Sequence, residues 1–147
     1  MRVLAAPVIL IVLSTTVVAD DNLIINQQYE NVSSEYAECA AYYRLVYSAT
    51  QSSGEAETAQ AYRQLEDSAM FYSLLLAGEG RTKDTAVEVT NSRIEMYLKK
   101  MKQEADNRNE NISVLINKYH FTCQEAMETP RDAVTEAMAR HAEELNQ

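Results

Sequence analysis

The sequence predicts an all-α protein: an antiparallel bundle of three to four helices that follows a cleaved signal peptide and contains one disulfide. Beyond residue 19 the chain has three glycines and one proline and is rich in good helix formers such as Ala, Glu, Leu and Lys. Apolar residues recur there at intervals of three and four, as on one face of a helix. The glycines and the proline lie where these runs end, which independently supports the helical interpretation.

The first residues have the pattern of a secretory signal peptide. Arg2 is basic, residues 3–18 are mostly apolar, and Ala19 is a small residue that two aspartates follow. This pattern predicts cleavage after Ala19 and export to the periplasm or the extracellular space. Residues 20–147 are then a single helical domain, long enough to bury a hydrophobic core.

The first helix is predicted over residues 24–52. Its apolar positions alternate in steps of three and four, the spacing that keeps one face of a helix against its neighbours. A Ser-Ser-Gly sequence at 52–54 ends the run. The residues of this face are Tyr29, Val32, Tyr36, Cys39, Tyr43, Val46 and Thr50.

The second helix is predicted over residues 54–77, with Ser53 as its N-cap. Gly78 and Gly80 follow it, and glycine readily adopts the left-handed conformation that ends a helix. The apolar face consists of Tyr62, Leu65, Ala69, Tyr72 and Leu76.

A third helix is predicted over 82–128, with Thr82 as its N-cap and a bend near 106–111, where the apolar pattern weakens and asparagines accumulate. The last helix is predicted over 130–145. Thr129 followed by Pro130 is a strong start signal, because proline suits the first helical position.

Cys39 and Cys123 are the only cysteines of the chain, and both lie on apolar faces of predicted helices. An even number of cysteines in an exported protein favours a disulfide. This pairing joins the first helix to the end of the third and is worth roughly 4–5 kcal/mol in the chain-entropy model.

The net charge of −9 argues against partners that are polyanions, namely nucleic acids and anionic membranes. Beyond the signal peptide no apolar run approaches the ~20 residues of a transmembrane helix, so no integral membrane span is predicted. The partner is expected to be another protein or a small apolar ligand. The regular apolar face of the first helix is also compatible with a homodimer.

Tyrosine is the most unusual feature of the composition: there are nine, against two phenylalanines and no tryptophan. They indicate a tyrosine-rich surface or pocket, although tyrosines of a half-buried core give the same pattern. Tyr42 lies off the main apolar face, so we expect at least one tyrosine of the first helix to be exposed. The residues predicted to bind a ligand or partner are Tyr36, Tyr42, Tyr43, Tyr47 and Tyr72.

These observations favour an exported, non-enzymatic binding or interaction protein without a cofactor. One alternative is a haem- or metal-binding bundle for electron transfer that uses His120 or His141 together with a methionine, although no Cys-x-x-Cys-His or Glu-x-x-His motif is present. Another is an enzyme whose site is not visible in the sequence. Glycosylation sequons at Asn31 and Asn111 matter only in a eukaryotic source.

Overall fold

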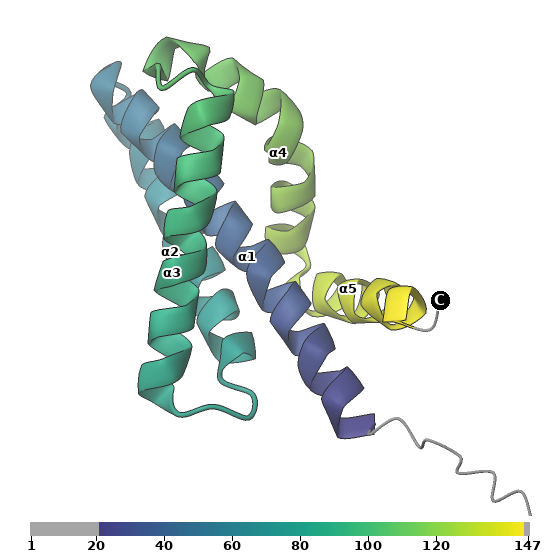
Figure 1. Cartoon of the computed structure of the whole chain (residues 1–147). Coiled ribbons are helices and arrows are strands. Elements are labelled where there is room, and N and C mark those ends of the chain that lie inside the picture. The colour runs from purple at the N-terminus through teal and green to yellow at the C-terminus, as the bar shows by residue number, and fades with distance from the viewer. Residues whose placement is uncertain (1–20, 146–147) are drawn as a thin grey trace, which may run out of the picture.

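The computed structural model describes the backbone of residues 21–145 and the side chains of residues 26–139; the predicted signal peptide and its cleavage site lie outside them. Within this part all regular secondary structure is helical, short turns join the helices, and no strand is present. The predicted all-α bundle with one disulfide is therefore confirmed (Figure 1). The helices are α1 (Asp21–Ser52), α2 (Ala56–Ala77), α3 (Lys83–Glu104), α4 (Ile112–Glu128) and α5 (Pro130–Leu145), with a 3₁₀ turn at Asn109–Asn111 before α4.

The longest helix, α1, is the centre of the bundle. It contacts each of the other four helices, and α3 and α4 lie on opposite sides of it in Figure 1. Three alanines, Ala37, Ala40 and Ala41, are fully buried on α1 and let neighbouring helices approach closely. As a result α1 is buried on more than one face, whereas a helix at the edge of a bundle buries a single stripe.

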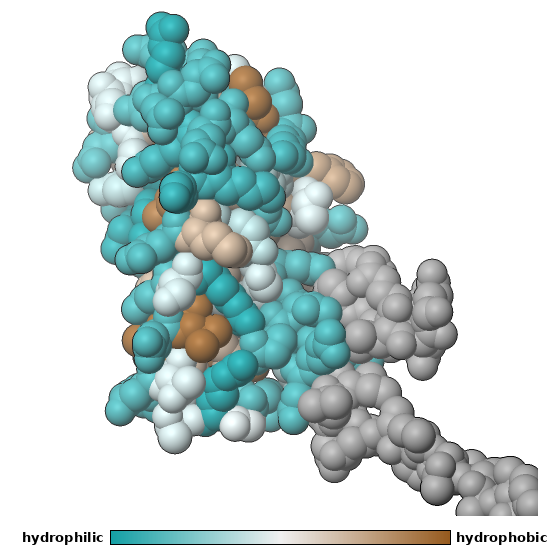
Figure 2. Space-filling view, in the orientation of Figure 1, coloured by the Kyte–Doolittle hydropathy of each residue, from teal (hydrophilic) through white to brown (hydrophobic). Residues whose placement is uncertain are grey.

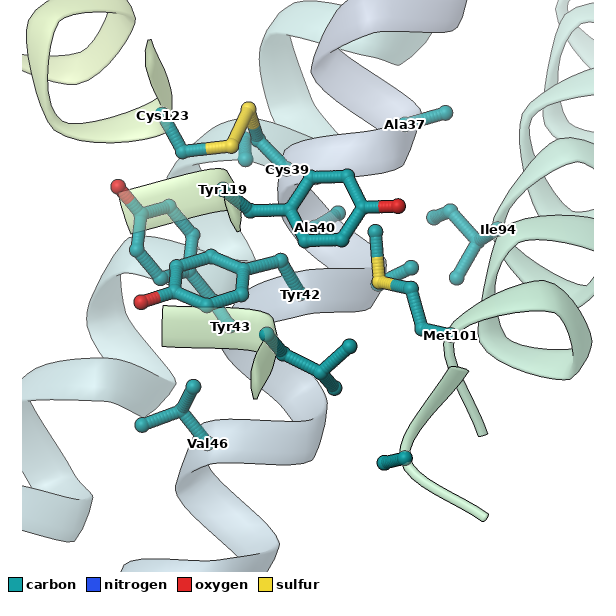
Figure 3. Close-up of a cluster of buried hydrophobic side chains, with 14 residues drawn as sticks. Ala37, Cys39, Ala40, Tyr42, Tyr43, Val46, Ile94, Met101, Tyr119 and Cys123 are labelled. Atoms are coloured by element: carbon teal, nitrogen blue, oxygen red, sulfur yellow. A yellow bond between two sulfur atoms is a disulfide. The ribbon is translucent and has the colours of Figure 1, made fainter. Parts of the chain in front are cut away.

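The core consists of two clusters of buried side chains. The larger cluster surrounds the disulfide and contains Tyr42 and Tyr43 of α1 (Figure 3). The Cα atoms of Cys39 and Cys123 are 5.4 Å apart, so the predicted bond joins α1 to α4. The smaller cluster consists of Val32, Tyr36, Leu76 and Ala137.

The segment expected as one bent helix over 82–128 is instead two helices that run in opposite directions (Figure 1). Asp106 and Asn107 have φ angles of 52° and 57°, which reverse the chain after α3. The Asn107 N–H donates to the Lys102 carbonyl at 2.7 Å, which closes the end of α3. Asp and Asn are the non-glycine residues that best tolerate this left-handed conformation, so the asparagine-rich stretch forms a turn. This division brings the number of α-helices within residues 21–145 to five.

Helix ends follow the sequence signals in part. Thr82 is the N-cap of α3, as predicted, and its hydroxyl accepts a hydrogen bond from the Thr85 N–H. Ser53 does not cap α2, because its hydroxyl donates back to the Thr50 carbonyl at 2.9 Å. After α2 the left-handed glycine is Gly80 (φ +72°).

Buried polar groups fix how α1 packs against its neighbours. Arg44 of α1 donates to the Glu66 carboxylate of α2 at 2.6 Å, and Glu66 is only 1% exposed. Arg63 forms a second ion pair with the same carboxylate. Farther along α1 the Ser33 hydroxyl donates to the Ser73 carbonyl at 2.8 Å. These bonds set the rotation and register of α1 against α2, because each buried polar group needs its partner.

The visible surface in Figure 2 is largely hydrophilic, with small separate hydrophobic areas. The most exposed large apolar side chain is Phe121, at 77%. None of the described helices is both long and apolar enough to cross a membrane.

Candidate functional site

The predicted tyrosines do not form one exposed surface. Tyr36, Tyr42 and Tyr43 are at most 2% exposed, and Tyr47 and Tyr72 are half-buried. The expectation that at least one tyrosine of the first helix is exposed is wrong: Tyr42 is fully buried, and Tyr29 and Tyr47 are only half-buried, because α1 is enclosed by helices on several sides.

The structure divides these five residues among three places. The ring centres of Tyr36 and Tyr72 lie 5.3 Å apart in the smaller cluster. Those of Tyr42 and Tyr43 lie 5.0 Å apart in the larger cluster. Tyr47 lies apart from both pairs, with the Arg63 guanidinium 5.8 Å from its ring centre.

One groove combines a predicted tyrosine with apolar walls and several polar groups. It lies where α1, α2 and α4 meet, and its volume is about 300 Å³. We call it the tyrosine groove. It is lined by Tyr43, Ala61, Tyr62, Leu65, His120, Gln124, Met127 and Glu128.

Two tyrosine hydroxyls at this groove have no hydrogen-bond partner in the part of the chain that the structure describes. The rings of Tyr43 and Tyr62 are 6.2 Å apart and tilted by 37°. Neither hydroxyl forms a hydrogen bond with another described residue. Among the described residues the only buried side-chain polar atom without a partner is Thr90 Oγ1, so these two hydroxyls are not sealed in the core and can pair with a molecule in the groove.

The Tyr43 hydroxyl stays protonated at neutral pH. Burial, followed by the neighbouring Tyr42, Tyr62 and Glu128, raises the pKa of Tyr43 well above its ordinary value. A protonated phenol both donates and accepts hydrogen bonds, so this group can pair with either kind of polar atom.

The polar side of the groove comes from one face of α4. His120, Gln124 and Glu128 are four residues apart, which aligns them along the helix. His120 Nδ1 and the Tyr42 hydroxyl share a hydrogen bond of 3.2 Å, and the Gln124 amide donates to the Glu128 carboxylate at 2.7 Å. From the sequence His120 is expected only as a haem or metal ligand, and Gln124 and Glu128 are not identified as site residues. The available signal was their spacing, since Gln124 is four residues and Glu128 eight residues after His120.

A second groove, of about 310 Å³, lies beside the disulfide between α1, α4 and α5. Its polar groups are more fully paired than those of the tyrosine groove. The Tyr36 hydroxyl is within hydrogen-bond distance of the Ala126 and Pro130 carbonyls, at 3.2 Å each. Lys118 donates to Glu104 at 2.8 Å. This groove therefore offers a ligand fewer open hydrogen-bonding groups.

The side chains described contain no group of three His, Cys, Asp or Glu residues that could hold a metal ion. The two cysteines are bonded to each other, and His120 is paired with Tyr42. The side chain of His141, the other histidine considered as a ligand, lies outside the described side chains.

Comparison of the chain with protein-family models, with curated proteins and with solved structures finds no match.

Proposed function

We propose that the protein is an exported binding module that holds a small, largely apolar aromatic ligand in the tyrosine groove. The observation that carries this proposal is that the hydroxyls of Tyr43 and Tyr62, on the wall of an apolar groove, have no hydrogen-bond partner among the described residues. A volume of about 300 Å³ is at the lower end for ligand pockets, which suits a molecule of one or two rings.

The lining supplies the two kinds of contact that such a ligand needs. The half-buried Tyr62 ring can stack on an aromatic ring or meet it edge to face, whereas Tyr43, at 1% exposed, contributes chiefly its hydroxyl. Leu65 and the flexible Met127 complete the apolar walls, and a thioether also contacts aromatic rings favourably. The phenol hydroxyls can then fix the orientation of a polar atom on the ligand.

Export is the part of the proposal that rests on the predicted signal peptide. The disulfide between Cys39 and Cys123 supports it, because such bonds persist mainly in oxidising compartments. A cross-linked helical scaffold also suits a binding site that must keep its shape outside the cell.

Indole is a suitable probe of the groove. The chain contains no tryptophan, so the emission of added indole can be followed without a protein background of the same kind. We expect saturable binding by the wild-type protein. Tyr62→Ala should weaken it about tenfold, since it removes one ring of the wall. Tyr43→Phe should weaken it about threefold, since it removes only a hydroxyl.

Tyr47→Phe is the matched control, because Tyr47 is a tyrosine of α1 outside the groove. This variant should bind indole as the wild type does. Absence of saturable binding to the wild type would overturn the proposal. An unchanged affinity of Tyr62→Ala, with the variant folded by circular dichroism, would also overturn it.

A further inference from the structure

The tyrosine groove has a one-sided charge. Of its eight lining residues only Glu128 carries a formal charge when histidine is counted as neutral. Its side chain is exposed, and its carboxylate accepts a hydrogen bond from Gln124 and forms no ion pair with a described lysine or arginine. The Glu128 carboxylate therefore has acceptor capacity that the described residues do not use.

The groove also presents tyrosine rings that lack a cation of their own. Elsewhere in the described chain, Lys118 lies 5.0 Å from the Tyr119 ring centre and Lys100 lies 5.6 Å from that of Tyr97. Cations are attracted to the faces of aromatic rings. The Tyr43 and Tyr62 rings have no such lysine or arginine among the described residues, although a carboxylate lies beside them.

The groove beside the disulfide is different, because Lys118 joins Glu35 and Glu38 in its lining. Both signs of charge are thus present there. The net charge of −9 adds a weak attraction for cations over the whole molecule, but it does not distinguish one groove from the other. The charges of the lining residues distinguish the two grooves, because the tyrosine groove contains one carboxylate and no lysine or arginine.

We infer that the ligand of the tyrosine groove is an organic cation: an amine joined to one or two aromatic rings, with the rings against Tyr62, beside the Tyr43 hydroxyl, and the ammonium group at the Glu128 carboxylate. This inference rests on the proposed function and adds the chemical class of the ligand. The ring contacts and the charge contact come from separate groups, so each can be removed without the other.

Three probes with the same ring system test the inference: neutral indole, cationic tryptamine and anionic indole-3-acetate. The titrations are made at about pH 8, where a primary amine is still protonated. We expect tryptamine to bind about tenfold more tightly than indole-3-acetate, with indole between them. Glu128→Gln should bring the three affinities within about twofold of one another and leave that of indole unchanged, because it removes only the charge.

Glu125→Gln is the matched control, because it removes the same charge from α4 at a residue outside the groove. It should keep the preference for tryptamine. If indole does not bind at all, the proposed function itself fails. If indole binds but the three probes bind equally, or if Glu125→Gln abolishes the preference as fully as Glu128→Gln does, only the inference of a cationic ligand is overturned.

Discussion

Removal of the disulfide should be one of the most destabilising changes available in this chain. Cys39 and Cys123 are 84 residues apart, and in the chain-entropy model a closed loop of this length lowers the entropy of the unfolded state. At 25 °C this corresponds to about 4.5 kcal/mol of stabilisation. The double variant Cys39→Ala, Cys123→Ala should lose about this amount.

The size of this loss matters because a domain of this kind has a free energy of unfolding of only about 5–15 kcal/mol. Both cysteines are at most 5% exposed and lie between α1 and α4. Alanine fills less of this space than the two sulfurs, so the packing defect adds to the entropic loss. The variant is expected to fold, but with a small remaining margin of stability.

Urea unfolding followed by circular dichroism measures the loss. The dependence of the unfolding free energy on urea should also become steeper in the variant, because the unfolded chain without the cross-link exposes more surface. Reductant should lower the stability of the wild type to near that of the variant and leave the variant unchanged. A variant within about 1 kcal/mol of the non-reduced wild type, or two free thiols in the wild type by mass spectrometry, would refute the reasoning.

Three further predictions concern single residues. Glu66→Ala should lower the free energy of unfolding, measured in urea, by about 3 kcal/mol, because it leaves two arginines without their buried partner. Asp67→Ala, which removes an exposed carboxylate of the same helix, should lower it by less than about 1 kcal/mol. Burial is the main cause that raises the pKa of Tyr36 to about 12, so the tyrosine keeps its proton to higher pH in the folded state than in the unfolded state. The free energy of unfolding should therefore fall between about pH 10 and pH 12. Unfolding measured at each pH should show a less steep fall in Tyr36→Phe. Asn107 has a φ angle of 57°, a left-handed conformation that alanine tolerates poorly and glycine adopts readily. Asn107→Ala should therefore lower the free energy of unfolding by about 1 kcal/mol, and Asn107→Gly should leave it unchanged. Equal melting temperatures for the two variants would contradict this explanation.

Local signals in the sequence were sufficient to predict much of the fold. Thr82 and Pro130 mark helix starts through chemistry that is confined to a few residues, and both signals agree with the structure. The pairing of Cys39 with Cys123 followed from their number and their positions on apolar faces.

The turn over residues 105–111 was harder to predict, for a physical reason. Met101 of α3 and Leu115 of α4 both face the same core, so the apolar repeat weakens at the turn but resumes beyond it. A repeat of this kind reports which residues are buried, and it does not report the direction of the chain. The left-handed residues Asp106 and Asn107 reverse the chain without ending that pattern.

The candidate site was predicted only in part. Tyr43 could be named from its place on the apolar face of α1. The full burial of Tyr42 could not be foreseen, because it depends on α1 being the central helix of the bundle. Tyr62 and Glu128 join Tyr43 only where three helices meet, and that meeting is a property of the tertiary structure.

We propose that the tyrosine groove is where this protein binds a small aromatic ligand. A titration of isotope-labelled protein with tryptamine, followed residue by residue by nuclear magnetic resonance, checks this claim. We predict that the changes in chemical shift concentrate at Tyr43, Tyr62 and the α4 residues from His120 to Glu128, and that they saturate together. Saturable changes confined to the groove beside the disulfide, or no saturable change at any residue, would contradict the claim.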